Sequence, residues 1–291
     1  MKNLLSKIVV TGFAALFVGL TSCDRIEENA NRDEKAEISA QDQTASLAES
    51  DDAVDASGEI MADASVSSKM TRTAGGKLTE TAETITLPSG IIVTITPKSG
   101  NSAGELVIDF GSTGIAYRSR LRKGKVKIAY TGKYRENNAQ QILTFENYAV
   151  APVGTTTFIV VDNATKKTVS HVINGSIYTT TIKAENAKLT YPDGSIVSWN
   201  SDRVRNWDVK NTLFDYTDDE ATLSGTFNGT NRNGVSYSVT STPNSPLLYK
   251  LACLATSGSV PVQGKMTITP AGGVAREIDF GNGSCDRNAT L

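Results

Sequence analysis

Short segments rich in β-branched and aromatic residues, separated by glycine-bearing turns, constrain the fold of this chain more than any other feature of its sequence. Many of them alternate polar with apolar side chains, which is typical of strands with one buried face. The clearest are Thr84–Leu87, Ile91–Thr96, Leu106–Phe110, Lys125–Tyr130, Thr157–Val161 and Ser236–Thr240. No comparable stretch shows a sustained helical period. We therefore predict an antiparallel all-β domain over residues 85–291, either a sandwich or a large twisted meander.

Turn signals support the antiparallel arrangement. Asn174-Gly175, Pro192-Asp193-Gly194 and Asn233-Gly234 each lie between two predicted strands. Glycine adopts the positive φ of tight hairpin turns at no steric cost. The tetrapeptide IDFG also occurs twice, at 108–111 and 278–281, and each copy follows an Ile-Thr-Pro segment. We interpret this similarity as an internal repeat of two strands and their turn.

The N-terminus predicts export. Lys2 and Lys7 flank the start of an apolar run of 13 residues, Ile8 to Leu20, which is shorter than a membrane span needs and typical of a secretory signal peptide over 1–22. The run ends in Leu20-Thr-Ser-Cys23, which resembles the lipobox of bacterial lipoproteins. That resemblance implies cleavage before Cys23 and acylation of Cys23, so the partner we expect is the lipid bilayer.

The charges are unevenly distributed along the chain. Residues 24–70 carry 13 Asp or Glu and four Lys or Arg, whereas residues 71–291 carry 23 Lys or Arg and 18 Asp or Glu. No aromatic residue occurs between Phe17 and Phe110. We predict that residues 23–84 are an acidic, flexible tether with room for one short helix near 51–64. Separately solvated segments are favoured over a latch between the acidic arm and the basic body.

Several longer motifs resemble a family. The segments 229–237 (GTNRNGVSY), 264–269 (GKMTIT) and 278–290 (IDFGNGSCDRNAT), with Cys253 between the first two, resemble the C-terminal half of uncharacterised all-β lipoproteins of the Bacteroidota type. SWNSDRVRNW and TFENYAV resemble their middle. The resemblance implies a surface-exposed lipoprotein of the outer membrane, without an established activity. Those relatives continue through another short hairpin where this chain stops.

With Cys23 assigned to the lipid, Cys253 and Cys285 remain. In a chain exported to an oxidising compartment, two cysteines predict a disulfide. Closing a loop of about 33 residues contributes roughly 3 to 4 kcal/mol on the chain-entropy model. A metal site or a nucleophilic pair is the alternative, but tetrahedral metal sites need four ligands and the chain has one histidine.

Motifs for catalysis are weak. Residues 100–104 match the G-x-S-x-G nucleophile elbow around Ser102, but a strand rather than a helix is expected to follow, and His171 is interpreted as a surface histidine on a strand. The acidic cluster Asp215, Asp218, Asp219 and Glu220 is interpreted as a solvated loop. Asp279, Asn282 and Asp286 could ligate calcium, but a glycine hairpin turn is favoured. We predict no metal, no other cofactor and no enzymatic activity; a carbohydrate-active enzyme with paired carboxylates is the alternative.

Binding is the chemistry that the sequence favours. Trp199, Ser201, Arg203, Arg205 and Trp207 alternate along one predicted strand and therefore share a face. Such a stripe can stack sugar rings and bind anionic groups, although Arg–Trp stacking is also an ordinary structural contact. A second basic run comprises Arg118, Arg120, Arg122, Lys123, Lys125 and Lys127, and a solvated surface is favoured there. We expect a non-enzymatic binding or structural module, with a glycan or another envelope protein as its partner and no nucleic acid.

Overall fold

The protein is described by a computed structural model that places residues 30–70, 81–98, 103–118, 120–134, 136–210, 218–253, 261–285 and 290. The described chain divides into two compact units. Unit 1 contains residues up to 52, residues 174–179 and residues from 197 onward, and unit 2 contains residues 53–173 and 180–196. Helix α1 (Ala30–Ala62) contributes residues 30–52 to unit 1 and residues 53–62 to unit 2, and we refer to these unequal parts as its N-terminal and C-terminal halves.

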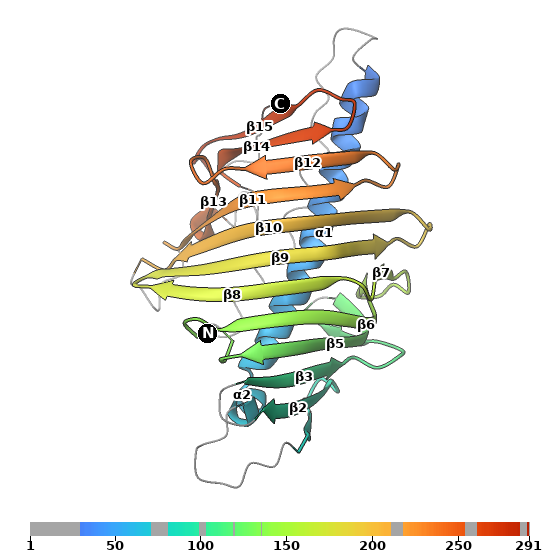
Figure 1. The fold of residues 1–291 in the computed structure, drawn as a ribbon, viewed down its shortest axis with the longest axis vertical. Coiled ribbons are helices and arrows are strands. Elements are labelled where there is room, and N and C mark those ends of the chain that lie inside the picture. Colours follow the sequence, from blue (N-terminus) through green and yellow to red (C-terminus); the bar gives the residue numbers. More distant parts are fainter. Residues whose placement is uncertain are drawn as a thin grey trace. The chain divides into compact units, whose positions relative to one another are not determined.

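Unit 2 contains helix α2 (Ala64–Met70) and an antiparallel sheet. Its strands follow one another in the order β1-β2-β3-β5-β6-β7-β9, with β4 paired to β5 and β8 paired to β6 and β9. Figure 1 shows β2, β3, β5 and β6 as successive neighbours. The strands are β1 (Glu83–Thr86), β2 (Ile92–Lys98), β3 (Ala103–Asp109), β4 (Ile115–Tyr117), β5 (Arg120–Thr131), β6 (Gln140–Pro152), β7 (Ile159–Val161), β8 (Lys166–Asn174) and β9 (Ile177–Thr190). One face of this sheet is buried and carries apolar side chains at alternate positions, such as Val93, Ile95 and Ile108, which are fully buried.

Unit 1 contains the remaining strands and the Cys253 region. Its sheet order is β10-β11-β12-β14-β13, with β15 paired to β14 and β13 also paired to β11. The elements are β10 (Ile196–Asp208), β11 (Glu220–Thr230), β12 (Ser236–Ser241), β13 (Leu247–Lys250), a 3-10 turn at Leu251–Cys253, β14 (Gln263–Pro270) and β15 (Arg276–Asn282). In Figure 1 the N-terminal half of α1 runs across these strands rather than along them.

These elements confirm the all-β prediction, and each predicted strand overlaps an observed one. Within each unit the paired strands belong to one hydrogen-bonded sheet, so the meander is the alternative that fits. The three predicted turns are also present, because Gly175, Gly194 and Gly234 have φ values of 59°, 83° and 77°.

The prediction of a flexible tether needs correction over residues 30–70, which form α1 and α2. Alanine is the residue with the highest helix propensity, and α1 is rich in it. Asp63 separates the two helices and accepts hydrogen bonds from the Ser65 backbone N–H at 2.9 Å and from the Ser65 hydroxyl, which caps the start of α2. Among the described residues, neither helix combines the length and the apolar character that crossing a membrane requires.

The two IDFG copies adopt the same local structure. In each copy the aspartate carboxylate accepts a hydrogen bond at 2.8 Å from the backbone N–H of the glycine two residues later, Gly111 or Gly281. Both glycines have positive φ, 72° and 86°, and both phenylalanines are buried. Each copy lies at the end of the second strand of an antiparallel hairpin, β2–β3 or β14–β15. The repeat is therefore a structural module in which the aspartate of each copy holds the turn that follows it.

Candidate functional site

The predicted Trp/Arg stripe lies on β10, which is continuous from Ile196 to Asp208. Trp199, Ser201 and Arg203 share one face, as predicted, but all three side chains are buried. The pairing of β10 with β11, and of β11 with β12, places aromatic rings of the three strands on that face. The rings of Trp199 and Phe227 stack with centroids 5.9 Å apart, and those of Phe227 and Tyr237 stack with centroids 5.7 Å apart.

Arg203 explains why this face is covered. Its guanidinium donates two hydrogen bonds to the carboxylate of Asp51 on α1, from Nη1 at 2.9 Å and from Nη2 at 2.7 Å. The Arg203 side chain is 5% exposed and the Asp51 side chain 18% exposed. A bidentate pair with little solvent around it is a strong charge-assisted interaction. The N-terminal half of α1 therefore lies on the same face as the stripe.

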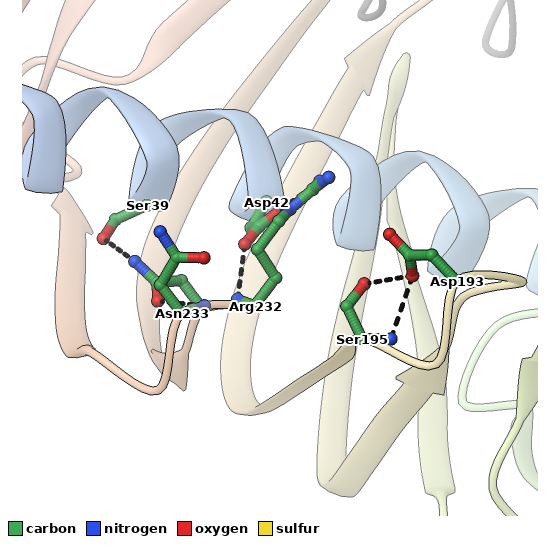
Figure 2. A network of polar contacts seen from close by, with 7 residues as sticks. Ser39, Asp42, Asp193, Ser195, Arg232 and Asn233 are labelled. Atoms are coloured by element: carbon green, nitrogen blue, oxygen red, sulfur yellow. Dashed lines mark hydrogen bonds and ion pairs between the residues drawn. The ribbon is translucent and has the colours of Figure 1, made fainter.

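A second carboxylate of α1 is held at the β11–β12 turn. Asp42 is fully buried and accepts hydrogen bonds from the backbone N–H of Arg232 at 2.7 Å and from its Nε, also at 2.7 Å. Ser39, one turn earlier in the helix, accepts a hydrogen bond at 3.0 Å from the side-chain amide of Asn231. Figure 2 shows Ser39 and Asp42 on the helix above this turn. Arg203 and Arg232 thus bind α1 at two points.

We refer to the residues that meet the N-terminal half of α1, and the aromatic row that shares their sheet face, as the helix-binding face of unit 1. It comprises Trp199, Ser201, Arg203, Phe227, Asn231, Arg232 and Tyr237. A further aromatic residue, Tyr249 on β13, is half-buried, and its hydroxyl oxygen is shielded from solvent and lies within the electrostatic influence of Asp51. Burial raises the pKa of the Tyr249 hydroxyl, and the negative charge of Asp51 raises it further, whereas Arg203 lowers it. Tyr249 therefore stays neutral beside the Asp51–Arg203 pair.

The other end of the stripe has structural contacts. Arg205 and Trp207 are half-buried, and Trp207 Nε1 donates a hydrogen bond at 3.0 Å to Asp219. Asp219 is buried, so the prediction of a solvated acidic loop is wrong for this residue. The neighbouring Glu220 accepts a hydrogen bond at 2.9 Å from Lys210.

Comparisons of the chain with protein-family models, with curated proteins and with solved structures found no match. The resemblance to lipoproteins of the Bacteroidota type therefore stays a prediction.

The C-terminal half of α1 makes a related contact in unit 2. The Arg118 guanidinium lies 3.3 Å from the Glu59 carboxylate, which also accepts a hydrogen bond at 3.3 Å from the Tyr117 hydroxyl. Burial, followed by the charge of Glu59 and this hydrogen bond, raises the pKa of Tyr117 to about 12. Arg118 has a φ of 51°, a conformation that is unusual for a residue with a side chain.

The basic run on β4 and β5 is engaged in structural contacts rather than forming one solvated surface. Arg122 is fully buried and donates a hydrogen bond at 2.7 Å to the Tyr148 hydroxyl. Lys127 forms an ion pair with Glu146 at 2.5 Å, and Lys123 lies 4.1 Å from the centroid of the Phe158 ring. The prediction of a solvated run is therefore wrong for Arg122.

His171 lies on β8 as predicted, but it is buried rather than on the surface. Its ring nitrogens lie 3.1 Å from Gln141 Oε1 and 3.2 Å from Thr180 Oγ1, and its ring contacts Tyr134 edge-on. Gln141 and Thr180 come from the strands on either side, so His171 links three strands.

The predicted disulfide is confirmed, because Cys253 and Cys285 are bonded in unit 1. Among the described residues, no group of three or more His, Cys, Asp or Glu is arranged to hold a metal ion. The strands flanking the G-x-S-x-G segment, β2 and β3, form an antiparallel hairpin. Four other predicted positions, Cys23, Ser102, Asp215 and Asp286, lie outside the described residues.

Sequence reasoning missed Asp42, Asp51 and Arg232 as interacting residues. The sequence did show that residues 24–70 are acidic and that residues 71–291 are mildly basic. This difference allows ion pairs between the two segments, but separately solvated segments were the favoured interpretation. The structure forms such contacts at specific residues of unit 1, so that interpretation needs correction. Their partners lie 152 and 190 positions apart, and charge counting along a sequence cannot pair them.

Proposed function

We propose that this protein is a lipid-anchored module of the cell envelope that acts by binding rather than by catalysis. The observation that supports the proposal is the helix-binding face of unit 1, where arginines hold the carboxylates of a helix. Planar guanidinium groups with fixed donors are suited to the recognition of carboxylates. The Trp199–Phe227–Tyr237 row adds the aromatic contact area that binding surfaces favour.

The proposed anchor determines where the module works. Cys23 precedes the start of α1 at Ala30 by seven residues, and such a segment spans at most about 24 Å. Because α1 is integrated into the fold, acylation of Cys23 keeps unit 1 close to the bilayer. The proposed location is the outer membrane, facing the cell exterior.

Membrane fractionation tests the anchor. We expect the full chain to sediment with the outer membrane, and Cys23→Ala to be released into the soluble envelope fraction. Labelling of intact cells with an impermeant amine reagent tests surface exposure. Release of the unsubstituted chain, or retention of Cys23→Ala, would contradict the proposed anchor.

A glycan array tests whether the partner is a carbohydrate or a protein. If the stripe binds sugars, we expect a signal that Trp199→Ala and Trp207→Ala abolish. If no glycan binds, a carbohydrate is excluded as the ligand and a protein partner is left. The carbohydrate-active enzyme stays an untested alternative; the contacts of Asp219 with Trp207 and of Glu220 with Lys210 favour structural roles for those two acids.

A further inference from the structure

The two halves of α1 differ in what they bury. In the N-terminal half, the buried apolar residues among those with a described burial are Ala36 and Ala40; the other buried side chains there are Ser39, Asp42, Gln43, Ser46, Glu49 and Asp52. In the C-terminal half, Val54, Ile60 and Met61 are buried, followed by Val66 and Met70 of α2. Burial of large apolar side chains is the main source of packing free energy. Among the side chains whose burial is described, the large apolar ones therefore pack in the C-terminal half, and charged contacts hold the N-terminal half.

The contact between the N-terminal half and unit 1 is also incompletely satisfied. Trp199 Nε1 and Ser201 Oγ, on the helix-binding face, have no hydrogen-bond partner among the described residues. The same is true of Gln43 Oε1 and Ser46 Oγ on α1. All four side chains are more than nine-tenths buried. A buried polar atom without a partner opposes the contact that buries it.

Trp199 and Ser201 share the face of β10 from which Arg203 reaches Asp51. The face thus offers one hydrogen-bond donor and one hydroxyl that no described side chain of α1 uses, on the strand that also carries Arg203. A helix that kept the carboxylates and added a bond to either atom would be a better occupant than α1.

The carboxylates also specify the geometry of such a helix. Asp42 and Asp51 are nine residues apart, which at about 100° per residue places them on roughly opposite sides of an α-helix. Arg232 and Arg203 therefore hold the helix from two sides, and a helix with one acidic stripe would satisfy one of them. Ser39 adds a third specific position through Asn231.

We infer that the helix-binding face of unit 1 is a docking surface for a carboxylate-bearing helix of another envelope protein, and that residues 30–52 occupy it as an exchangeable internal ligand. The inference rests on the proposed binding function and gives it a partner class. The partner helix carries two acidic residues at the spacing of Asp42 and Asp51, with a polar side chain between them that reaches Trp199 or Ser201. The C-terminal half of α1 keeps the displaced segment attached to unit 2.

A fluorescent synthetic peptide of residues 30–52 tests this inference on the full chain. The double variant Asp42→Arg, Asp51→Arg releases the internal helix by charge repulsion and leaves Arg203 and Arg232 intact. We expect this variant to bind the peptide at least about tenfold more tightly than the unsubstituted protein, whose face is occupied. The matched control Glu34→Arg, Glu37→Arg makes the same charge change at exposed positions of α1 and should bind no better than the unsubstituted protein.

Two further measurements identify the contacts. A peptide with Asp42→Asn and Asp51→Asn should lose binding, and so should the released variant when Arg203→Ala and Arg232→Ala are added. Circular dichroism, with thiol labelling of Cys253 and Cys285, verifies that each variant is folded. Binding of the peptide that does not depend on these arginines would overturn the inference. Dimerisation of the released variant through the same arginines would also overturn it, because the occupant would then be a second copy.

Hydrogen exchange of the unsubstituted protein provides a test that needs no variant. We expect backbone amides of residues 36–46 to exchange at least about tenfold faster than those of residues 53–61, because the N-terminal half opens separately. Equal protection of the two halves would show that α1 opens as one unit and would overturn the inference. None of these measurements depends on Cys23, so their failure would leave the proposed membrane anchor intact.

Discussion

Asp51 and Arg203 come from positions 152 residues apart and form two hydrogen bonds between charged groups that are largely removed from water. Removing one charge of such a pair lowers the free energy of unfolding more than removing both charges does. The reason is that the remaining charge is still buried but no longer has an opposite charge beside it. The exposed pair Lys98–Glu105, with side chains 60% and 61% exposed, has no such asymmetry. Solvent screens this pair, and its contribution to stability is small.

The first prediction concerns these two pairs. Arg203→Ala should lower the free energy of unfolding by about 1.5 to 3 kcal/mol, because the carboxylate of Asp51 loses both of its bonds to Arg203. Adding Asp51→Ala should recover part of that loss. Lys98→Ala, the matched control, should change stability by less than about 1 kcal/mol. Chemical denaturation of the four proteins provides the comparison, and equal effects of Arg203→Ala and Lys98→Ala would contradict the prediction.

At the scale of single residues, the sequence predicted orientation better than environment. Alternation along a strand fixes which side chains share a face, so the common face of Trp199 and Arg203 could be read directly from their spacing. Whether that face is covered depends on a segment distant in sequence. For the same reason, the strand of His171 was predicted correctly but its burial was not. The side chains that surround His171 and bind its ring nitrogens come from neighbouring strands.

Helix α1 was the element that the sequence predicted least well. An amphipathic helix is recognised by a stripe of large apolar residues, whereas the buried residues described in the N-terminal half of α1 are two alanines together with serine, glutamine and acidic residues. The acidic composition of residues 24–70 is also typical of disordered segments. Contacts with arginines far along the chain add to the stability of this part of the helix, and a local pattern cannot show them. The strands, in contrast, were predictable because the alternation of polar and apolar residues and the turn residues that flank them are local in the sequence.

The β5–β6 pair contains a β-bulge that constrains one glycine. The register shifts between Lys123 and Lys125, and Gly124 between them has a φ of 78°. A Cβ atom on Gly124 would lie 2.1 Å from the carbonyl oxygen of Asn147, which is far inside van der Waals contact. Gly111 has a similar φ of 72°, but a Cβ there would have no other atom within 4 Å. A side chain at either glycine would therefore be strained by the left-handed backbone conformation, but only a side chain at Gly124 would also clash with a neighbouring backbone atom.

The second prediction follows from this pair of glycines. Gly111→Ala should cost about 1 to 2 kcal/mol, the penalty for a side chain in the left-handed region. Gly124→Ala should cost about 1 to 3 kcal/mol more, because the backbone of Asn147 must move. Thermal denaturation of the two variants measures the difference. Equal losses would show that the bulge accommodates a methyl group.

Two tyrosines of unit 2 connect the helices to the sheet and predict a response to alkaline pH. Burial raises the pKa of Tyr117 and of Tyr130 from 10.0 to about 12 in both cases, with Glu59 adding to the effect at Tyr117. The Tyr130 hydroxyl donates a hydrogen bond at 3.3 Å to the carbonyl oxygen of Met70 at the end of α2. The folded state thus holds both phenol protons more tightly than the unfolded chain does.

The third prediction is the sign and the range of this pH dependence. The stability that these two groups contribute is fully present below about pH 10 and is lost as the pH rises through about 12, because the unfolded chain releases its phenol protons first. Tyr117→Phe combined with Tyr130→Phe should flatten the loss of stability over that range. Denaturation at several alkaline pH values measures it, with tyrosinate absorbance as the reporter of ionisation. An unchanged pH profile in the double variant would refute the assignment to these tyrosines.

At the scale of the whole molecule, the disulfide and both tryptophans belong to unit 1. The chain has two tryptophans, Trp199 and Trp207, and both lie on β10. Tryptophan fluorescence therefore reports on unit 1, whereas far-ultraviolet circular dichroism reports on the strands of both units. Cys253 follows β13, and Cys285 follows β15. The bond thus closes the C-terminal hairpin β14–β15 onto the strand that precedes it.

The fourth prediction uses these two signals. Cys253→Ser combined with Cys285→Ser should destabilise unit 1 by roughly 3 to 4 kcal/mol, because the unfolded chain regains the freedom of a loop of about 33 residues. The fluorescence transition should then move to lower denaturant concentration, and the part of the circular dichroism signal that comes from unit 2 should move less. If both signals shifted together by the same amount, the two units would unfold cooperatively. If neither shifted, the bond would restrain a segment that contributes little to the stability of unit 1.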